Sequence, residues 1–166
     1  MSSAPRDPGP GMAQAAVPIR DGTQHDLDAV DRIMRAAFDP RYGEGWTRSQ
    51  CAGILPMMGV SMRLAGDPVA GFSLARTIAD EAELLLIAVA PEAQRHGLGQ
   101  SLLDDFVARA HAEGARRLHL EMRDNNPAIA LYSASGFRPA GRRRDYYSGP
   151  SGERHDAITL VLEGRT

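Results

Sequence analysis

The sequence predicts a single domain of the α/β (α+β) class, with a central sheet of about seven strands flanked by about four helices. Segments with strand patterns and segments with helical periodicity follow one another in the order β-α-α-β-β-β-α-β-α-β-β. The length of 166 residues and the hydrophobic content of 43% suffice for one well-packed core and are short for two. An apolar run followed directly by a glycine-containing loop and a helix marks the centre of this order.

The first predicted helix follows a strand near residues 16–20. Thr23 and Asp26 supply its start signals, a capping side chain followed by an acidic residue. Its apolar residues recur at helical spacing and form one face, made of Leu27, Val30, Met34 and Phe38. We expect that face to pack against the sheet.

A short second helix and a β-hairpin come next. Thr47 and Gln50 have the spacing of a capping box, which predicts a helix start at this point. Strands are expected at residues 60–65 and 69–78, joined by a turn at residues 66–68 that contains Gly and Pro.

The second half of the chain alternates strands and helices before a final pair of strands. The expected elements are a strand at 84–89, a helix from Leu98, a strand at 118–123, a helix from Pro127, and strands at 140–146 and 157–162.

The loop between the strand at 84–89 and the next helix has the properties of an anion site. Gly97 and Gly99 allow main-chain N–H groups to approach a ligand closely, and the helix N-terminus adds a partial positive charge. Gln94 and Arg95 can reach the same anion. The segment therefore predicts a pyrophosphate-binding loop, with a glycine turn that only packs the helix as the alternative.

Two common phosphate-binding motifs do not fit this loop. The dinucleotide fingerprint requires a third glycine, but the residue three positions after Gly99 is Leu102. No acidic residue ends a second strand about 20 residues further on, as that fingerprint also requires. The Gly-Lys-Ser/Thr sequence of a Walker A loop is absent as well.

The remaining pattern, Gln94-x-x-Gly97-x-Gly99, resembles the acyl-CoA loop of the GCN5-related N-acetyltransferase (GNAT) superfamily. The resemblance implies a GNAT fold, in which the central sheet is mixed, and acetyl-CoA as cosubstrate. It also implies the residues that bind the coenzyme, which are Ile87, Ala88, Val89, Gln94, Arg95, His96, Gly97, Leu98, Gly99 and Gln100.

A second segment resembles the same superfamily. Asn125-Asn126-Pro127 provides a capping residue and a proline at the first helical position. The string Asn125-x-x-Ala128-x-x-Leu131-Tyr132-x-x-x-Gly136-Phe137 is similar to the second GNAT signature. The resemblance implies that Asn125 contacts the coenzyme. Asn126 could exchange roles with it, and a helix-capping role for Asn125 stays open.

The C-terminal half resembles the bacterial ribosomal-protein-alanine N-acetyltransferases (RimI type) from about residue 82 to residue 162, about half of the chain. The sequence departs from that pattern in three places. One residue is missing between Arg123 and Ala128, Leu86 replaces an expected polar residue, and residues 39–45 look like an insertion before Trp46. Because substrate should bind near this insertion, we expect it to narrow the pocket for the first residue of an acceptor.

Composition limits the partners. The formal charge of −2 and the pI near 6.2 provide no basic field for nucleic acid, and no apolar run approaches the length of a membrane span. Neither nucleic acid nor a membrane is therefore expected as a partner. Cys51 is the single cysteine and the histidines lack ligand spacing, so no metal is expected and a reducing, cytoplasmic location fits.

Residues 1–15, rich in Pro and Gly, are expected to form a disordered tail before a domain at 16–166.

Acetyl transfer to an amine requires a neutral nucleophile, a stabilised oxyanion and a proton for the departing thiolate. Glu121 is the expected general base, with Glu83 on the preceding strand as its rival and a solvated carboxylate as the alternative. Tyr132 is expected to protonate the thiolate, unless it is a plain core aromatic. The oxyanion donor is expected to be a backbone N–H at residues 87–89, where a splayed strand would leave one free.

The acceptor is the least specified part of the site. Tyr146 and Tyr147 resemble tyrosines that grip the substrate backbone in protein N-terminal acetyltransferases, although ordinary strand aromatics fit as well. Trp46 and Tyr42 are expected to line the opposite wall. An α-amine has a pKa of about 7.8 and a lysine side chain about 10.4, so a single weak base suits the α-amine.

The expected function is therefore an acetyl-CoA-dependent N-acetyltransferase that acts on the α-amine of a protein N-terminus by direct transfer through a ternary complex. An acetyltransferase for small amines is the enzymatic alternative. A non-catalytic acyl-CoA-binding module is the alternative of another class.

Overall fold

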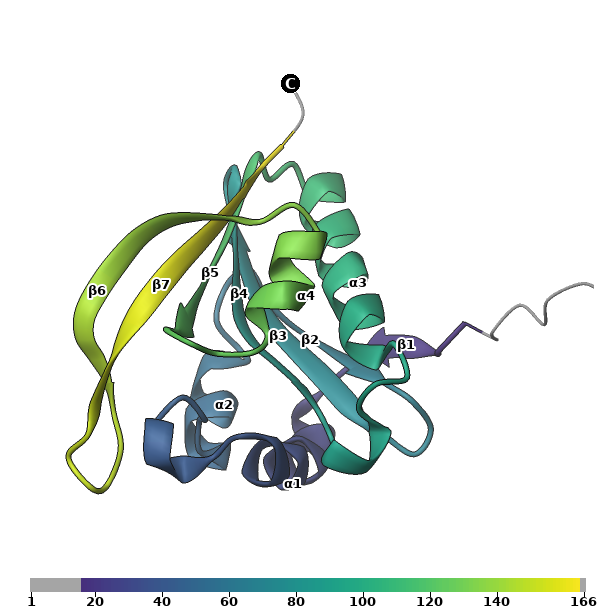
Figure 1. Cartoon of the computed structure of the whole chain (residues 1–166). Coiled ribbons are helices and arrows are strands. Elements are labelled where there is room, and N and C mark those ends of the chain that lie inside the picture. Colours follow the sequence, from purple (N-terminus) through teal and green to yellow (C-terminus); the bar gives the residue numbers. More distant parts are fainter. Residues whose placement is uncertain (1–15, 165–166) are drawn as a thin grey trace, which may run out of the picture.

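A computed structural model describes residues 16–164, so the tail expected at residues 1–15 lies outside the described residues, as do residues 165–166. Seven strands form one mixed sheet in the order β1-β2-β3-β4-β5-β7-β6 (Figure 1). The fold class predicted from the sequence is thereby confirmed, including the order of the elements along the chain. The strand ends differ from the predicted ends by a few residues, which is common for boundaries inferred from sequence patterns.

The strands are β1 (Ile19–Asp21), β2 (Val60–Ala65), β3 (Gly71–Ile78), β4 (Glu81–Val89), β5 (Arg117–Arg123), β6 (Arg138–Ser148) and β7 (Arg154–Glu163). The helices are α1 (Leu27–Ala37), α2 (Arg48–Ile54), α3 (Leu98–Ala112) and α4 (Ile129–Ala134). Three short 3₁₀ helices complete the described chain, namely η1 (Gln24–Asp26), η2 (Pro40–Tyr42) and η3 (Pro91–Ala93).

The pairing of β4 with β5 divides the sheet into two halves. These strands are parallel, whereas all other neighbours are antiparallel. Their ladder ends at Leu84 and Leu120, although β4 continues to Val89 beside β3 and β5 continues to Arg123 beside β7. The two halves of the sheet therefore diverge beyond this point, and the separation between β4 and β5 is visible in Figure 1.

A β-bulge in β4 lies at the start of the divergence. Leu74 pairs with Leu86 and Ala75 pairs with Leu84, so Leu85 is the extra residue. The side chain of Leu84 packs in the cluster that contains residues of α3 and α4, but Leu86 packs in the cluster that contains residues of α1 and α2. Since residues two apart in a regular strand share one face, the bulge sends these leucines to opposite faces.

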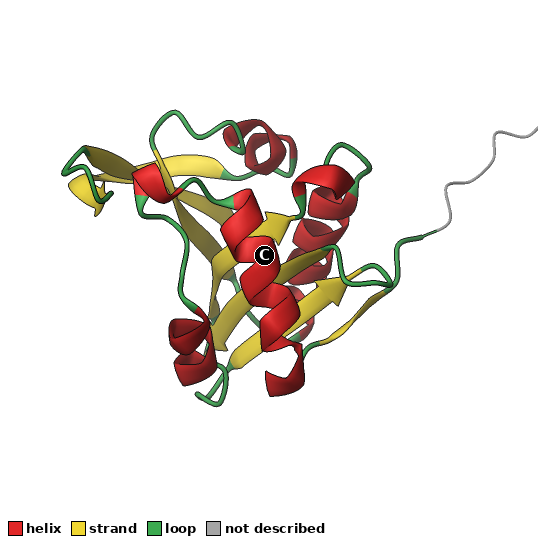
Figure 2. Ribbon diagram, turned by 90° about the horizontal axis from the view of Figure 1, so that it is seen from below, coloured by secondary structure: helices red, strands yellow, loops and turns green. Residues whose placement is uncertain are grey.

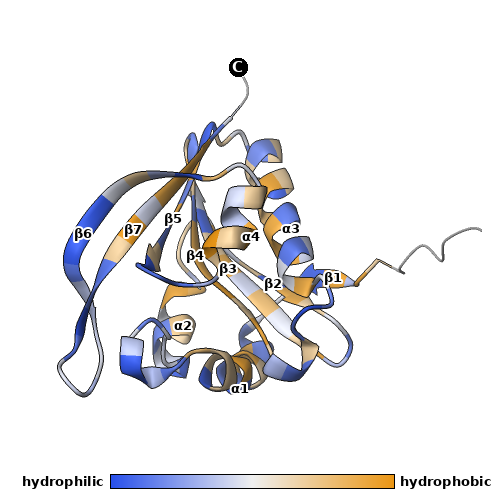
Figure 3. Ribbon diagram, viewed as in Figure 1, coloured by the Kyte–Doolittle hydropathy of each residue, from blue (hydrophilic) through white to orange (hydrophobic). Residues whose placement is uncertain are grey.

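The helices cover both faces of the sheet (Figure 2). Each face has its own hydrophobic cluster. On one face Phe106 and Phe137 pack with strand residues, and on the other face Phe72 packs with α1 and with Cys51 of α2. Strand β6, at the sheet edge, is mainly hydrophilic and exposed (Figure 3). None of the helices within residues 16–164 combines the length and the hydropathy needed to cross a bilayer.

Candidate active site

The divergence of β4 and β5 opens into a cavity of about 490 Å³. Its walls come from both strands, the loop before α3, the start of α4, strand β6 and the segment between α1 and α2. Ten predicted site residues line it, namely Ile87, Ala88, Val89, Gln94, Arg95, Leu98, Gly99, Glu121, Tyr132 and Tyr147. Six others do not, namely Trp46, His96, Gly97, Gln100, Asn125 and Tyr146.

The edge of β4 that faces the cavity carries main-chain N–H groups. The N–H of Ala90 donates to the carbonyl of Ala70, on the β3 side, with an N···O distance of 2.7 Å. Because successive N–H groups of a strand point to opposite edges, those of Ile87 and Val89 point away from β3, toward the side that β5 has left. The carbonyl of Val89, on the same edge, accepts a bond from Gln94 Nε2 at 3.0 Å.

The loop after β4 presents further donors at the start of α3. Gly97 is the N-cap residue and has a φ of +83°, a conformation that favours glycine. The N–H of Ser101 bonds to the Gly97 carbonyl, so the N–H groups of residues 98–100 precede the first intrahelical bond. A Cβ added at Gly99 would lie 3.7 Å from Leu131 Cδ2, an ordinary contact. Alanine therefore fits at Gly99 without disturbing the fold.

The predicted loop residue Gln100 has a structural contact instead of a place in the cavity. Its Nε2 donates to Asp104 Oδ1 at 2.8 Å and to Ser135 Oγ at 3.0 Å. The bond to Ser135 ties α3 to the end of α4, so Gln100 connects the two helices that flank the cavity.

The two candidate bases lie in different environments. Glu121 on β5 lines the cavity, and its side chain is 18% exposed. Its Oε1 lies 3.1 Å from Nε of Arg143 on β6. Glu83 does not line the cavity, because it lies beside His119 in the part of the ladder where β4 and β5 are still paired. Position therefore favours Glu121 over Glu83.

Two tyrosines line the cavity, Tyr132 and Tyr147. Tyr132 on α4 is 6% exposed, and burial, followed by the charge of Glu44, raises its pKa well above the usual value. Burial also raises the pKa of Tyr147, with smaller contributions from the charges of Glu44 and Glu121. Both phenols are therefore protonated at neutral pH and can donate. Tyr146 is exposed and packs edge-to-face on Tyr147, with ring centroids 5.0 Å apart.

The two adjacent asparagines, Asn125 and Asn126, lie in different environments. Asn126 lines the cavity, and its Oδ1 accepts a bond from the N–H of Ala128 at 2.9 Å. This bond holds a turn before α4, so the helix predicted to begin at Pro127 begins at Ile129. Asn125 is exposed with a φ of +63°, and its N–H bonds to Asp124 Oδ1. Of the two asparagines, Asn126 lines the cavity and Asn125 does not.

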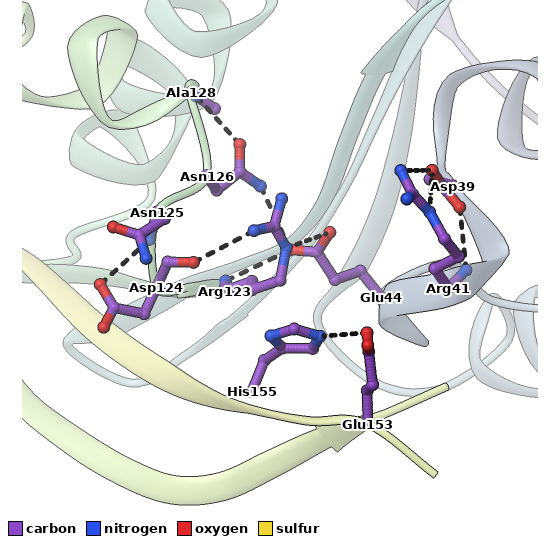
Figure 4. Close-up of polar contacts among 10 residues, drawn as sticks. All are labelled: Asp39, Arg41, Glu44, Arg123, Asp124, Asn125, Asn126, Ala128, Glu153 and His155. Atoms are coloured by element: carbon purple, nitrogen blue, oxygen red, sulfur yellow. Dashed lines mark hydrogen bonds and ion pairs between the residues drawn. The ribbon is translucent and has the colours of Figure 1, made fainter. Parts of the chain in front are cut away.

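Sequence reasoning missed Glu44, which lines the cavity from the segment between α1 and α2. Its side chain is 11% exposed and points toward Arg123 and Asn126 (Figure 4). No local pattern marks this residue, because its partners lie 79 and 82 positions away in the chain. The only signal was its place in the insertion-like segment at residues 39–45.

Of the two aromatic residues expected to line the opposite wall, Tyr42 and Trp46, only Tyr42 lines the cavity. Tyr42 lines the cavity, and Cζ of Arg123 lies 3.7 Å from the centre of its ring. Trp46 lies in a separate groove, beside Phe38 and the β6–β7 turn. Among residues 16–164, no three His, Cys, Asp or Glu side chains are grouped as a metal site requires.

Comparisons of the sequence place it among acetyltransferases. Residues 27–137 match the Acetyltransferase (GNAT) family. Over 95 residues the chain is 43% identical to [ribosomal protein bS18]-alanine N-acetyltransferase of Escherichia coli (strain K12), which covers 57% of this chain and 64% of that protein. The Haemophilus influenzae enzyme of the same name is 35% identical over 98 residues, 59% of this chain and 67% of that protein. The match thus spans less than two thirds of the E. coli relative.

Comparisons of the structure agree. The crystal structure of ribosomal-protein-S18-alanine N-acetyltransferase from E. coli superposes with a TM-score of 0.80 at 32% identity, covering 91% of this chain and 96% of that chain. A GNAT superfamily phosphinothricin acetyltransferase from Sinorhizobium meliloti, in complex with AcCoA, has the same fold, with a TM-score of 0.74, 23% identity and 89% of both chains covered. Since the family match spans most of the chain and the solved structures share its fold, the chain belongs to the GNAT acetyltransferase family.

Proposed function

We propose that the protein transfers the acetyl group of acetyl-CoA to the α-amine of a protein N-terminus, directly and within a ternary complex. The observation that carries this proposal is the cavity between β4 and β5. Main-chain donors, the carboxylate of Glu121 and the phenol of Tyr132 all face this one space. The similarity to ribosomal-protein-alanine N-acetyltransferases supports the choice of acceptor.

The donor side of the cavity suits acetyl-CoA. The N–H groups at the start of α3 and the partial positive charge of the helix end would hold its pyrophosphate, and Arg95 at the cavity wall would add a positive charge. Gly99 lines the same cavity and contributes no side chain to it. The N–H groups of Ile87 and Val89 would donate to the thioester oxygen as negative charge develops on it.

Two side chains would move the protons. Glu121 would accept a proton from the acceptor amine through water. Tyr132 would donate its phenolic proton to the departing thiolate, since it lines the cavity and is protonated at neutral pH. Tyr147 would contact the backbone of the acceptor, because it is the member of the tyrosine pair that faces the cavity.

The charges of the cavity favour a protein N-terminus over a polyamine. Among the described residues, three carboxylates line the cavity, and each has an arginine partner: Asp39 with Arg41, Glu44 with Arg123, and Glu121 with Arg143. An acidic groove that binds a polycation would need carboxylates without such partners. The presence of both Glu121 and Tyr132 in the cavity argues against a module that has lost turnover.

Mass spectrometry of peptides incubated with acetyl-CoA tests the proposed function. Each peptide should carry a free N-terminal alanine and one internal lysine, and spermidine should be assayed in parallel. We expect one acetyl group on the N-terminal amine and none on the lysine. Equal acetylation of lysine or spermidine would contradict the N-terminal acceptor while leaving acetyl transfer intact.

Gly99→Asp should weaken acetyl-CoA binding by about tenfold or more, because it places a carboxylate against the pyrophosphate. Gly99→Ala is the matched control, since its Cβ makes only ordinary contacts and adds no charge. Isothermal titration calorimetry with acetyl-CoA measures both variants. Unchanged affinity in Gly99→Asp would mean that the pyrophosphate binds elsewhere.

Glu121→Gln should lower the rate by about 10²-fold or more at neutral pH, the range typical of a lost general base. The loss should shrink above pH 8, because the α-amine is then neutral without help. Glu83→Gln is the matched control and should retain activity, because Glu83 lies outside the cavity. Initial rates across pH decide the assignment. An unchanged pH–rate profile in Glu121→Gln together with a large loss in Glu83→Gln would transfer the role to Glu83.

A further inference from the structure

The segment at residues 39–45 forms one wall of the cavity and is held on two sides. Gly43 has a φ of +66°, and a Cβ at this position would collide with the carbonyl of Ser148. A Cβ at Gly149 would likewise collide with the carbonyl of Arg41. On this side the segment therefore packs backbone to backbone against the turn between β6 and β7.

On its other side the segment is held by the carboxylate of Glu44. Oε1 accepts bonds from the backbone N–H of Arg123 at 3.2 Å and from Asn126 Nδ2 at 3.2 Å, and Oε2 lies 3.4 Å from Arg123 Nε (Figure 4). Arg123 ends β5, and Asn126 forms the turn before α4. One side chain thus connects segment 39–45 with the end of β5, the strand of Glu121, and with the turn that leads into α4, the helix of Tyr132.

The pairing of Glu44 with Arg123 is a buried one. Each side chain is only 11% exposed, and the guanidinium also lies over the ring of Tyr42 from the same segment. Burying two charges incurs a desolvation penalty that an apolar pair does not have, so a buried ion pair is weak evidence for stability. Its role is better explained by the positions in which it holds the two side chains. Here the contacts of Arg123 with Glu44 and Tyr42 fix the position of residues 42–44 relative to the end of β5.

Both substrates must share the space that this geometry leaves. The cavity of about 490 Å³ must hold both the acetyl end of the coenzyme and the start of the acceptor. Tyr42, Glu44 and Tyr147 line the same cavity as Glu121. Moving the segment outward would widen the cavity where the acceptor residue lies, without touching the donors at the start of α3.

We propose that Glu44 determines acceptor specificity: by fixing segment 39–45 against the end of β5 and the turn before α4, it restricts the first acceptor residue to a small side chain. This inference rests on the proposed N-terminal acetylation. Glu44 acts through the position of the segment, so it is a positioning residue and takes no part in proton transfer.

Peptides that differ only in the first residue, alanine or leucine, test this role in the full-length protein. The readout is the ratio of kcat/KM for the alanine peptide to kcat/KM for the leucine peptide. Glu44→Gln keeps the shape of the side chain but lacks the charge that pairs with Arg123, and Glu44→Ala removes all three contacts. We expect the ratio to fall by about tenfold in Glu44→Ala, a typical discrimination by pocket shape, and by less in Glu44→Gln.

Asp28→Ala is the matched control, because it removes an exposed carboxylate of α1 that pairs with Arg48 of α2, outside the cavity. The alanine-to-leucine ratio of kcat/KM in Asp28→Ala should equal that of the wild-type protein. Melting temperature and acetyl-CoA affinity, measured for every variant, identify any loss of folding. If Glu44→Ala is too unstable to assay, the ratio in Glu44→Gln decides.

Three outcomes would overturn the proposal. A ratio that stays constant while both rates fall equally would assign Glu44 a purely structural role. Equal acetylation of both peptides by the wild-type protein would show that the enzyme does not select the first residue. N-terminal acetylation itself would remain supported. Acetylation of spermidine but of neither peptide by the wild-type protein would overturn the proposed function, and the Glu44 proposal with it.

Discussion

Two neighbouring parallel strands that stop pairing leave main-chain N–H groups without their ladder partners, and such groups are costly to leave unsatisfied inside a protein. In this chain β4 and β5 pair only as far as Leu84 and Leu120, whereas each continues beside its other neighbour. The N–H groups of Ile87 and Val89 consequently face the cavity. The positions of the loop, the base and the phenol follow from this divergence, because they lie on the two strands and on the elements that follow them.

Paired charges fix the remaining walls. Each carboxylate that lines the cavity among the described residues has an arginine partner. Two of these pairs join different elements: Arg143 of β6 meets Glu121 of β5, and Glu44 of segment 39–45 meets Arg123 at the end of β5. Segment 39–45 thereby becomes part of the site, and its packing on the β6–β7 turn completes the wall.

Local patterns in the sequence sufficed for the fold and for half of the site. The strand, loop and helix around Gly97 and Gly99 are contiguous, and so are the strand of Glu121 and the helix of Tyr132, so periodicity and family motifs place them. The other half depends on tertiary contacts. Asn125 and Asn126 are chemically identical, and only the fold shows which one faces the cavity. Neither the contact of Glu44 with Arg123 nor the bulge at Leu85 leaves a local signal.

Residue-resolved amide hydrogen exchange, followed by NMR with and without acetyl-CoA, tests most directly whether the open edge of β4 binds the cosubstrate. If it does, exchange at Ile87 and Val89 slows when acetyl-CoA is added, because their N–H groups gain acceptors. Leu86 and Ala88 serve as internal controls, since their N–H groups point toward β3 in the existing ladder. Unchanged exchange at Ile87 and Val89 under saturating acetyl-CoA would contradict the assignment of this edge as the binding site.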